Sequence, residues 1–274
     1  MVIFEKVEVT VITLLQKNGF ILQKPKTIYE QARLTKGGVT LTLYTSGKLL
    51  LQGNELEEKK IAAELQKLKI GEMQKEEEFR KEAGWIIGSD ECLKGDTFGG
   101  LIVAAVKADM ELRQRLIELG VRDSKRLSDV EIIPLAEKIR TLAPCAIKSL
   151  LPEEYNAKSG TVTFLLNKLH QELGDYLAPG KHIVDKYPGC AVGNLMVEKG
   201  ESKYVEVAAA SILARDAGLK QLQYLSGQAG FALPKGSTHV QLALLELKER
   251  GLDFRKFVKV DFGNVVDFLG NQGI

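Results

Sequence analysis

The chain has 274 residues, 45% of them hydrophobic, which is enough to fill the core of one large domain or of a small and a larger one. Its net charge of +2 and pI near 8.3 exclude recognition of a polyanion through global charge, so such a partner would need a local basic patch. Cys92, Cys145 and Cys190 lack CxxC spacing, which argues against a disulfide framework or zinc site and favours a reducing cytoplasm. The sequence has no run of about 18 apolar residues, so no membrane span is predicted.

Residues 1–53 are predicted to form a small unit with a helix and an antiparallel sheet. The stretch GGVTLTLYTSGKLLLQG alternates apolar and polar residues around Ser46-Gly47, which predicts a β-hairpin with arms at 39–44 and 48–52. Another strand-like run covers 28–34. The unit holds seven basic and three acidic residues, and we expect its exposed cations, Lys48 among them, to contact a polyanion.

Residues 54–80 are predicted to be a charged helical connector, because Ile61, Leu65 and Leu68 recur at helical spacing before the segment becomes polar and glycine-interrupted. From Trp85 onward the pattern changes. The apolar runs WIIGSDE, GGLIVAAVKAD and HIVDKY predict strands, whereas SDVEIIPLAEKIRTLA, GTVTFLLNKLHQELGDYL and YVEVAAASILARDAGLKQLQYL predict helices. This alternation predicts an α/β domain with a mixed sheet over residues 81–274.

Four acidic residues lie at positions where a metal site could form. Asp90 and Glu91 end one predicted strand, Asp185 ends another, and Glu201 lies just before the last long helix. Hydrolysis of a phosphodiester with divalent metals needs hard oxygen ligands that hold two ions about 4 Å apart, and carboxylates at the ends of adjacent strands supply that geometry. An acid after a strand is also common as a turn residue or helix cap, so none of the four identifies a metal site alone.

The order of several motifs resembles a known family. Seven segments are similar in order and spacing, over about residues 84–265, to the type 2 family of ribonucleases H: IIGSDECLKGDTFGGLIVAAV, GVRDSKRLSD, YNAKSGTVTFLLNKLHQ, IVDKYP, KGESKYVEVAAASILAR, LPKGSTHV and FVKVDFGN. The basic hairpin unit before them resembles the TATA-binding-protein-like N-terminal domain that marks the ribonuclease HIII branch. Glu201 in the KGES segment also resembles that branch, since ribonuclease HII usually has Asp there.

This resemblance implies an endonuclease that hydrolyses the RNA strand of an RNA/DNA hybrid and leaves 5′-phosphate and 3′-hydroxyl ends. It implies that Asp90, Glu91, Asp185 and Glu201 hold Mg²⁺ or Mn²⁺ and that water is the nucleophile. The lack of any recognisable Ser-His-Asp or Cys-His motif agrees with a reaction that needs no protein nucleophile.

The turn after the two adjacent acids departs from the family. Where the family has Gly-Lys-Gly, this chain has Leu93-Lys94-Gly95. Recognition of RNA depends on the 2′-hydroxyl, which a glycine-rich backbone can approach closely, whereas leucine adds bulk and disfavours a positive φ. We therefore predict that Leu93→Gly favours cleavage at a single embedded ribonucleotide. The alternative interpretation is that Leu93 packs against the domain and holds the turn.

Other expected substrate contacts also follow from the resemblance. Asp123, Ser124 and Lys125 match the family's DSK motif, in which a hydroxyl and an ammonium suit phosphate oxygens, although a helix-start turn is the alternative interpretation. Lys235 and Ser237 flank a glycine in a loop that is either a substrate contact or a plain turn. His170, on a predicted amphipathic helix, is expected to be a packing or surface residue.

We therefore expect an α/β protein in three parts: a TATA-binding-protein-like α+β substrate-binding domain over 1–53, the connector over 54–80, and a ribonuclease-H-like catalytic domain over 81–274. The expected partner is an RNA/DNA hybrid, with no membrane contact, and the protein is expected to be a cytoplasmic monomer. Two other functions stay open on the sequence: ribonuclease HII-like cleavage at single ribonucleotides in duplex DNA, and catalytically silent binding of hybrids.

Overall fold

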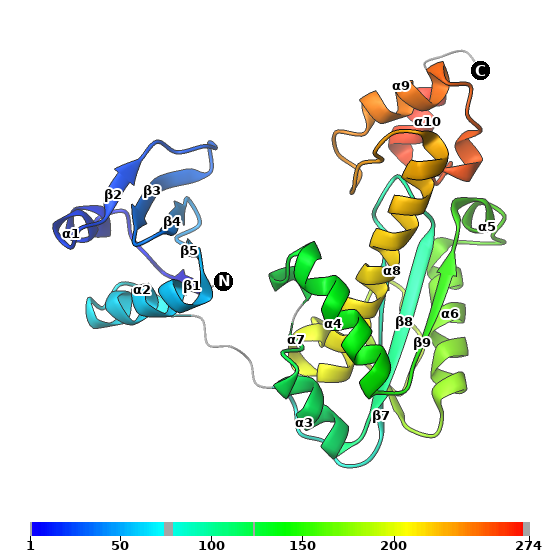
Figure 1. The fold of residues 1–274 in the computed structure, drawn as a ribbon, viewed down its shortest axis with the longest axis horizontal. Helices are drawn as coiled ribbons and strands as arrows, with labels where there is room; N and C mark the ends of the chain where they lie inside the picture. Colours follow the sequence, from blue (N-terminus) through cyan, green and yellow to red (C-terminus); the bar gives the residue numbers. More distant parts are fainter. Residues whose placement is uncertain (1, 74–78, 123, 271–274) are drawn as a thin grey trace. The chain divides into compact units, whose positions relative to one another are not determined.

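The computed structural model describes residues 2–73, 79–122 and 124–270. The chain divides into two compact units, residues 1–76 and 77–274 (Figure 1). Each unit has its own apolar core. No helix among the described residues is long and apolar enough to cross a membrane.

The first unit is a six-stranded antiparallel sheet with two helices, and its strand order is β2-β3-β4-β5-β1-β6. Its elements are β1 (Val2–Glu5), α1 (Val11–Lys17), β2 (Ile21–Gln23), β3 (Glu30–Lys36), β4 (Val39–Tyr44), β5 (Leu49–Gln52), α2 (Glu55–Lys67) and β6 (Glu72–Met73). The predicted hairpin is confirmed as β4 and β5. The strand predicted at 28–34 begins two residues later, because Thr27 to Glu30 form a turn in which Glu30 N–H donates to the Thr27 carbonyl at 3.2 Å.

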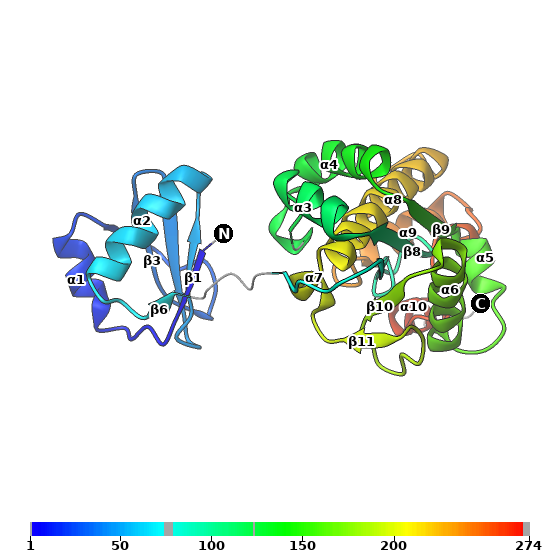
Figure 2. The same ribbon diagram turned by 90° about the horizontal axis from the view of Figure 1, so that it is seen from below.

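The helix predicted within a connector is part of this first unit instead. Ile61 and Leu65 of α2 are buried in the same cluster as Leu41 and Leu51 of the sheet, and Figure 2 shows α2 lying across the strands. The apolar spacing that predicted a helix therefore marks the face that covers the sheet. The alternate residues of the strands, such as Arg33, lie on the other face.

The second unit is a mixed five-stranded sheet covered by helices. Its elements are β7 (Ile86–Cys92), β8 (Leu101–Ala108), α3 (Met110–Glu118), η1 (Ser124–Arg126), α4 (Asp129–Leu142), β9 (Cys145–Leu150), α5 (Pro152–Asn156), α6 (Val162–Leu177), β10 (Lys181–Asp185), β11 (Leu195–Val197), α7 (Gly200–Lys203), α8 (Val205–Ala229), α9 (Gln241–Glu249), η2 (Phe254–Lys256) and α10 (Gly263–Gly270). The strand order is β11-β10-β7-β8-β9. Strands β7, β8 and β9 pair antiparallel, whereas β10 pairs parallel with β7 and with β11. The predicted α/β class and mixed sheet are confirmed.

Strand β8, which pairs with the central strand β7, contributes to two cores, because its side chains alternate between the faces of the sheet. Ile102, Ala104 and Val106 pack in the cluster that contains α4 and α8, whereas Leu101 and Val103 pack in the cluster that contains α6. Figure 2 shows α3, α4 and α8 together on one face of this sheet and α6 apart from them. Both faces of the sheet are therefore covered by apolar side chains, and polar residues that can bind a ligand lie at the ends of its strands.

Helix α8 lies unusually close to strand β7. A Cβ atom at Gly88 would come within 2.3 Å of the Val207 backbone nitrogen, and Ala208, Ala209 and Ala210 are fully buried. Small residues on both elements allow this approach. The contact brings the first turns of α8 beside the last residues of β7, where the acidic residues lie.

Candidate active site

Strand β7 delivers its two acids to opposite faces of the sheet. The face of Gly88 meets α8, so Asp90, two residues on, points to the same side. Ser89 and Glu91 point to the α6 side, where the Glu91 Oε2 atom lies 3.6 Å from His170 Nε2. Because both acids are in the last three residues of the strand, both reach the same end of the sheet.

All four predicted carboxylates line one cavity of about 240 Å³. Asp185 is the last residue of β10, which runs parallel to β7 as its direct neighbour, and Glu201 lies on the short helix α7. The complete lining is Asp90, Glu91, Cys92, Ser124, Lys125, Asp185, Glu201, Ser211 and Arg215. Acids that are more than a hundred residues apart in the sequence are thus gathered by the sheet order.

Backbone amides orient two of the carboxylates. Asp90 Oδ1 accepts a hydrogen bond from the Glu91 N–H at 2.8 Å, and Asp185 Oδ1 accepts one from the Gly200 N–H at 2.6 Å. The second bond ties the end of β10 to the start of α7, the helix that carries Glu201. These bonds engage one oxygen of each carboxylate with the main chain.

Lysines neutralise the other two carboxylates. Lys94 Nζ donates to Glu91 Oε1 at 2.8 Å and lies 4.9 Å from the centre of the Tyr187 ring. Lys125 forms an ion pair with Glu201, which also accepts a hydrogen bond from Ser211 Oγ at 3.3 Å. Both lysines were predicted to contact substrate, and both lie beside the acids.

Burial and mutual repulsion destabilise the anionic form of the cavity's acids. Burial raises the pKa of Asp90 well above its usual range, and the neighbouring charges of Glu91 and Asp185 raise it further. Burial also raises the pKa of Asp185, while the hydrogen bond from Gly200 opposes the shift. For Glu91, burial is outweighed by the nearby His170 and Lys94, so its pKa is below the usual value.

The donor set fits a hard divalent cation. Carboxylate oxygens are the ligands that Mg²⁺ and Mn²⁺ prefer, and a cation relieves repulsion between buried acids. Glu91 Oε2 is buried and lacks a hydrogen-bond partner among the described residues, so it can serve as a ligand atom. Among the described residues, no group of three or more His, Cys, Asp or Glu side chains is arranged closely enough to hold a metal ion. Cation binding therefore needs small side-chain movements.

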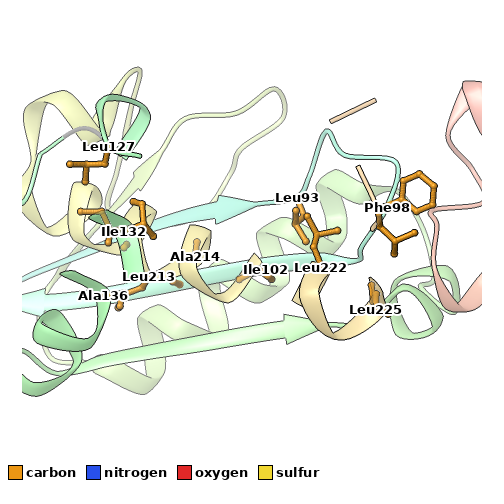
Figure 3. Close-up of a cluster of buried hydrophobic side chains, with 14 of the residues drawn as sticks. Leu93, Phe98, Ile102, Leu127, Ile132, Ala136, Leu213, Ala214, Leu222 and Leu225 are labelled. Atoms are coloured by element: carbon orange, nitrogen blue, oxygen red, sulfur yellow. The ribbon is translucent and has the colours of Figure 1, made fainter. Parts of the chain in front are cut away.

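Leu93 adopts the conformation that its side chain disfavours. Its φ is +62°, in the left-handed region, yet its side chain is only 5% exposed. Figure 3 shows it in the apolar cluster with Phe98 and Leu222. The structure therefore favours the interpretation that Leu93 packs against the domain and holds the turn. Apolar burial compensates for the strain of a positive φ, which leucine disfavours.

The other predicted substrate residues have different positions. Ser124 lies in the cavity, where its hydroxyl is 2.9 Å from that of Ser211, whereas Asp123 lies outside the described residues. Lys235 forms an ion pair with Asp129 outside the cavity lining. The Ser237 carbonyl accepts a hydrogen bond from Asn264 Nδ2 at 3.0 Å.

The remaining two have simpler surroundings. Gly95 has no atom within 4 Å of the position that a Cβ would take, so this part of the turn is open. Lys48 belongs to the first unit, where it is exposed and lies 3.7 Å from Glu5. Nothing in its surroundings prevents contact with a polyanion.

Further polar residues lie around the cavity and at the end of β7. Arg215, one turn along α8 from Ser211, lines the cavity and donates to Asp129 at 2.9 Å. Of the two alternatives predicted for His170, packing and surface, the structure supports packing: the side chain is fully buried, and its Nδ1 is 2.7 Å from Ser89 Oγ. His182 Nε2 lies 2.8 Å from the same hydroxyl. No local sequence pattern predicts this network of Ser89, His170 and His182.

Similar proteins are known by sequence and by structure. A family model described as Ribonuclease HII matches residues 87–181. Ribonuclease HIII of Bacillus mycoides (strain KBAB4) is 31% identical, over 91% of this chain and 95% of the relative. Ribonuclease HIII of Chlamydia pneumoniae is 36% identical, over 86% of each chain. The crystal structure of Bst-RNase HIII in complex with Mn²⁺ matches with a TM-score of 0.62 and 26% identity, over 98% of each chain.

Proposed function

Because this chain belongs to the ribonuclease HIII family and hydrolyses the RNA strand of RNA/DNA hybrids, we propose that the cavity lined by its four carboxylates is where that strand is cut. The observation that supports this site is the convergence of Asp90, Glu91, Asp185 and Glu201, from three separate elements, on one polar cavity. The enzyme works with Mg²⁺ or Mn²⁺, and these acids would hold the ions.

The chain's own residues have distinct tasks in this proposal. When bound, the divalent cation lowers the pKa of water and neutralises charge on the phosphate. Asp90 and Asp185 are oriented for that ion by the Glu91 and Gly200 amides. Lys94 and Lys125 pair with Glu91 and Glu201, and with these acids engaged by an ion the two ammonium groups would be available to donate to phosphate oxygens. Water is the nucleophile, and the products carry 5′-phosphate and 3′-hydroxyl ends.

The first unit is proposed to grip the hybrid through the open face of its sheet. The helices cover the face that carries Leu41 and Leu51, which leaves Arg33, Thr35 and Thr40 on the other side. These polar side chains and the exposed Lys48 of the same unit suit a sugar-phosphate backbone. This is the role that the resemblance to a TATA-binding-protein-like domain implies.

Assembly and location are also proposals. The thiols of Cys92, Cys145 and Cys190 are free, which agrees with a reducing compartment such as the cytoplasm. We propose that one copy of the chain is the active species, since all the proposed metal ligands come from one unit of one chain. Light scattering at the concentrations used for the cleavage assay measures the mass directly.

The decisive test of the site replaces single acids without changing their size. Asp90→Asn and Asp185→Asn should each abolish cleavage of a uniform RNA/DNA hybrid, because each removes an anionic ligand, while hybrid binding persists. Mn²⁺ binding measured by calorimetry should weaken in parallel. Asp267→Asn, at an exposed position on α10, is the matched control and should behave as wild type.

Near-normal rates in either variant at saturating Mg²⁺ would contradict the metal-site assignment. The assay should include a duplex with one embedded ribonucleotide, because efficient cleavage there would indicate a ribonuclease HII-like activity as well. Binding of hybrid by the wild type without any cleavage would instead indicate a silent binding protein.

A further inference from the structure

Lys259 is a fully buried lysine outside the proposed metal site. It lies between η2 and α10, with an exposed fraction of 0%. Its Nζ donates to the Leu93 carbonyl at 2.7 Å and to the Asp96 carbonyl at 2.5 Å. A lysine more than 160 positions away in the sequence therefore binds both ends of the turn that follows the adjacent acids.

Burying this ammonium has a cost that the two carbonyls offset. Burial lowers the pKa of Lys259 to about 8, although nearby Asp96 and Asp261 oppose that shift. The group is therefore still mostly protonated at neutral pH. The rings of Phe262 and Tyr155 lie 5.0 and 5.4 Å from Nζ and exclude water. Both hydrogen bonds go to the main chain, so the ammonium acts on backbone geometry.

These two bonds set the direction of the peptide groups in the turn. The turn closes with a 3.2 Å hydrogen bond from the Asp96 N–H to the Leu93 carbonyl, the same carbonyl that Lys259 binds. In a trans peptide the C=O and the following N–H point in opposite directions. The Lys94 N–H therefore points away from Lys259. The Thr97 N–H, after the second carbonyl, donates to the Gly236 carbonyl at 3.0 Å.

The outward side of the turn is next to the cavity. Lys94 contacts Glu91, which lines the cavity, and Gly95 is open to approach. A main-chain N–H that is held at this point can donate to the oxygen of a ribose 2′-hydroxyl, the group that separates RNA from DNA. Its direction depends on the carbonyls that Lys259 holds.

We propose that Lys259 is a positioning residue for substrate recognition, which holds the 93–96 turn so that the Lys94 N–H faces the ribose beside the cavity. This inference rests on the proposed active site. Loss of the ammonium removes one hydrogen bond from the Asp96 carbonyl and leaves the Leu93 carbonyl with only the bond from the Asp96 N–H, so the turn should relax and bind the ribose less well. Lys259 donates to the turn and to none of the four acids, so the chemical step should change less than substrate binding.

Lys259→Met tests the proposal, and Lys158→Met is its matched control. Lys158 also lies over the Tyr155 ring, at 3.8 Å, but its partner is Asp261 at 2.7 Å rather than the turn. Lys259→Met should raise KM for a uniform hybrid about tenfold and change kcat less than about threefold. Mn²⁺ affinity should be unchanged. Cleavage at a single embedded ribonucleotide should fall further, because one sugar then carries the whole RNA signal.

A second variant keeps the proposal testable if Lys259→Met does not fold. Lys259→Gln retains one donor without the charge and should give an intermediate KM. Unchanged KM and unchanged substrate preference in a folded Lys259 variant overturn the proposal, as does a fall in Mn²⁺ affinity that accounts for the loss. Failure of the wild-type enzyme to cut any hybrid would instead overturn the proposed function.

Discussion

Replacement of Leu93 by glycine separates two opposing effects at one residue. The change removes a buried leucine side chain, and comparable Leu→Ala changes in protein cores cost about 2–5 kcal/mol. It also relieves a left-handed backbone at φ +62°, which costs a leucine about 1–2 kcal/mol. Glycine loses roughly 0.5–1 kcal/mol through the greater freedom of the unfolded chain. The net expectation is a loss of about 2–3 kcal/mol.

Leu93→Ala is the informative comparison. Alanine removes most of the same side chain but keeps the left-handed strain, so it should be less stable than glycine by roughly 1 kcal/mol although it is larger. Gly99 and Gly218 lie against the Leu93 side chain, and a Cβ at Gly99 would come within 2.7 Å of it. Neither glycine has a side chain that could move into the space left by the leucine. The cavity left by either change should therefore persist.

Calorimetry of the full chain, followed at the melting transition of the second unit, measures the stability of both variants against wild type. For a unit of this size, the glycine variant should melt roughly 5–10 °C below wild type, and the alanine variant a few degrees lower still. Cleavage of a uniform hybrid and of a duplex with one ribonucleotide should both fall, because a loosened turn affects both substrates. An unchanged melting temperature for Leu93→Gly, or an alanine variant that is more stable than the glycine variant, would contradict this balance of cavity and strain.

Three further predictions concern other parts of the molecule. Deleting residues 1–76 should weaken hybrid binding and flatten its salt dependence, with kcat less affected, and titrations at several salt concentrations would contradict this if neither quantity changed. Burial lowers the pKa of His182 to about 4, so the unfolded chain binds more protons between pH 4 and 6.5, and the free energy of unfolding should fall by up to about 3 kcal/mol as pH drops through that window. In urea unfolding, His182→Gln should reduce the change in the free energy of unfolding between pH 4 and 6.5. If that change stayed as large as in the wild type, groups other than His182 would be responsible for it. Arg113→Met should lower the free energy of unfolding by about 3–5 kcal/mol, because it leaves buried Glu206 without its ion-pair partner. Adding Glu206→Gln to this variant should recover part of that loss in denaturant unfolding. No recovery would mean that the unpaired charge is not the cause of the loss.

Local periodicity was enough to predict most elements. The hairpin of β4 and β5 shows a repeat of two residues, and the helices α4 and α6 show an amphipathic pattern, whereas the strands β7, β8 and β10 were predicted from apolar runs and the helix α8 from a long stretch rich in small residues. Helix α2 shows the limit of such patterns. Its apolar stripe predicted a helix, but whether the stripe covers a sheet or another partner depends on residues far along the chain.

The acids of the site were visible in the sequence as residue types, and their role came from the order of motifs around them. Their meeting in one cavity depends on the parallel pairing of β10 with β7, which brings Asp185 beside Asp90. An acid at a strand end looks the same whether it faces a metal or solvent, so the pattern alone left alternatives open.

By itself, the sequence determined the two kinds of unit and the order of their main elements, and it singled out the four acids that we propose as metal ligands, because these depend on local patterns and motif order. Only the tertiary structure decided that Leu93 is buried with a positive φ, that Ser89 joins His170 to His182, and that Lys259 binds the turn at Leu93. These contacts join residues about 80 to 170 positions apart. The energy of such a contact depends on how whole elements pack, and no short stretch of sequence carries that information.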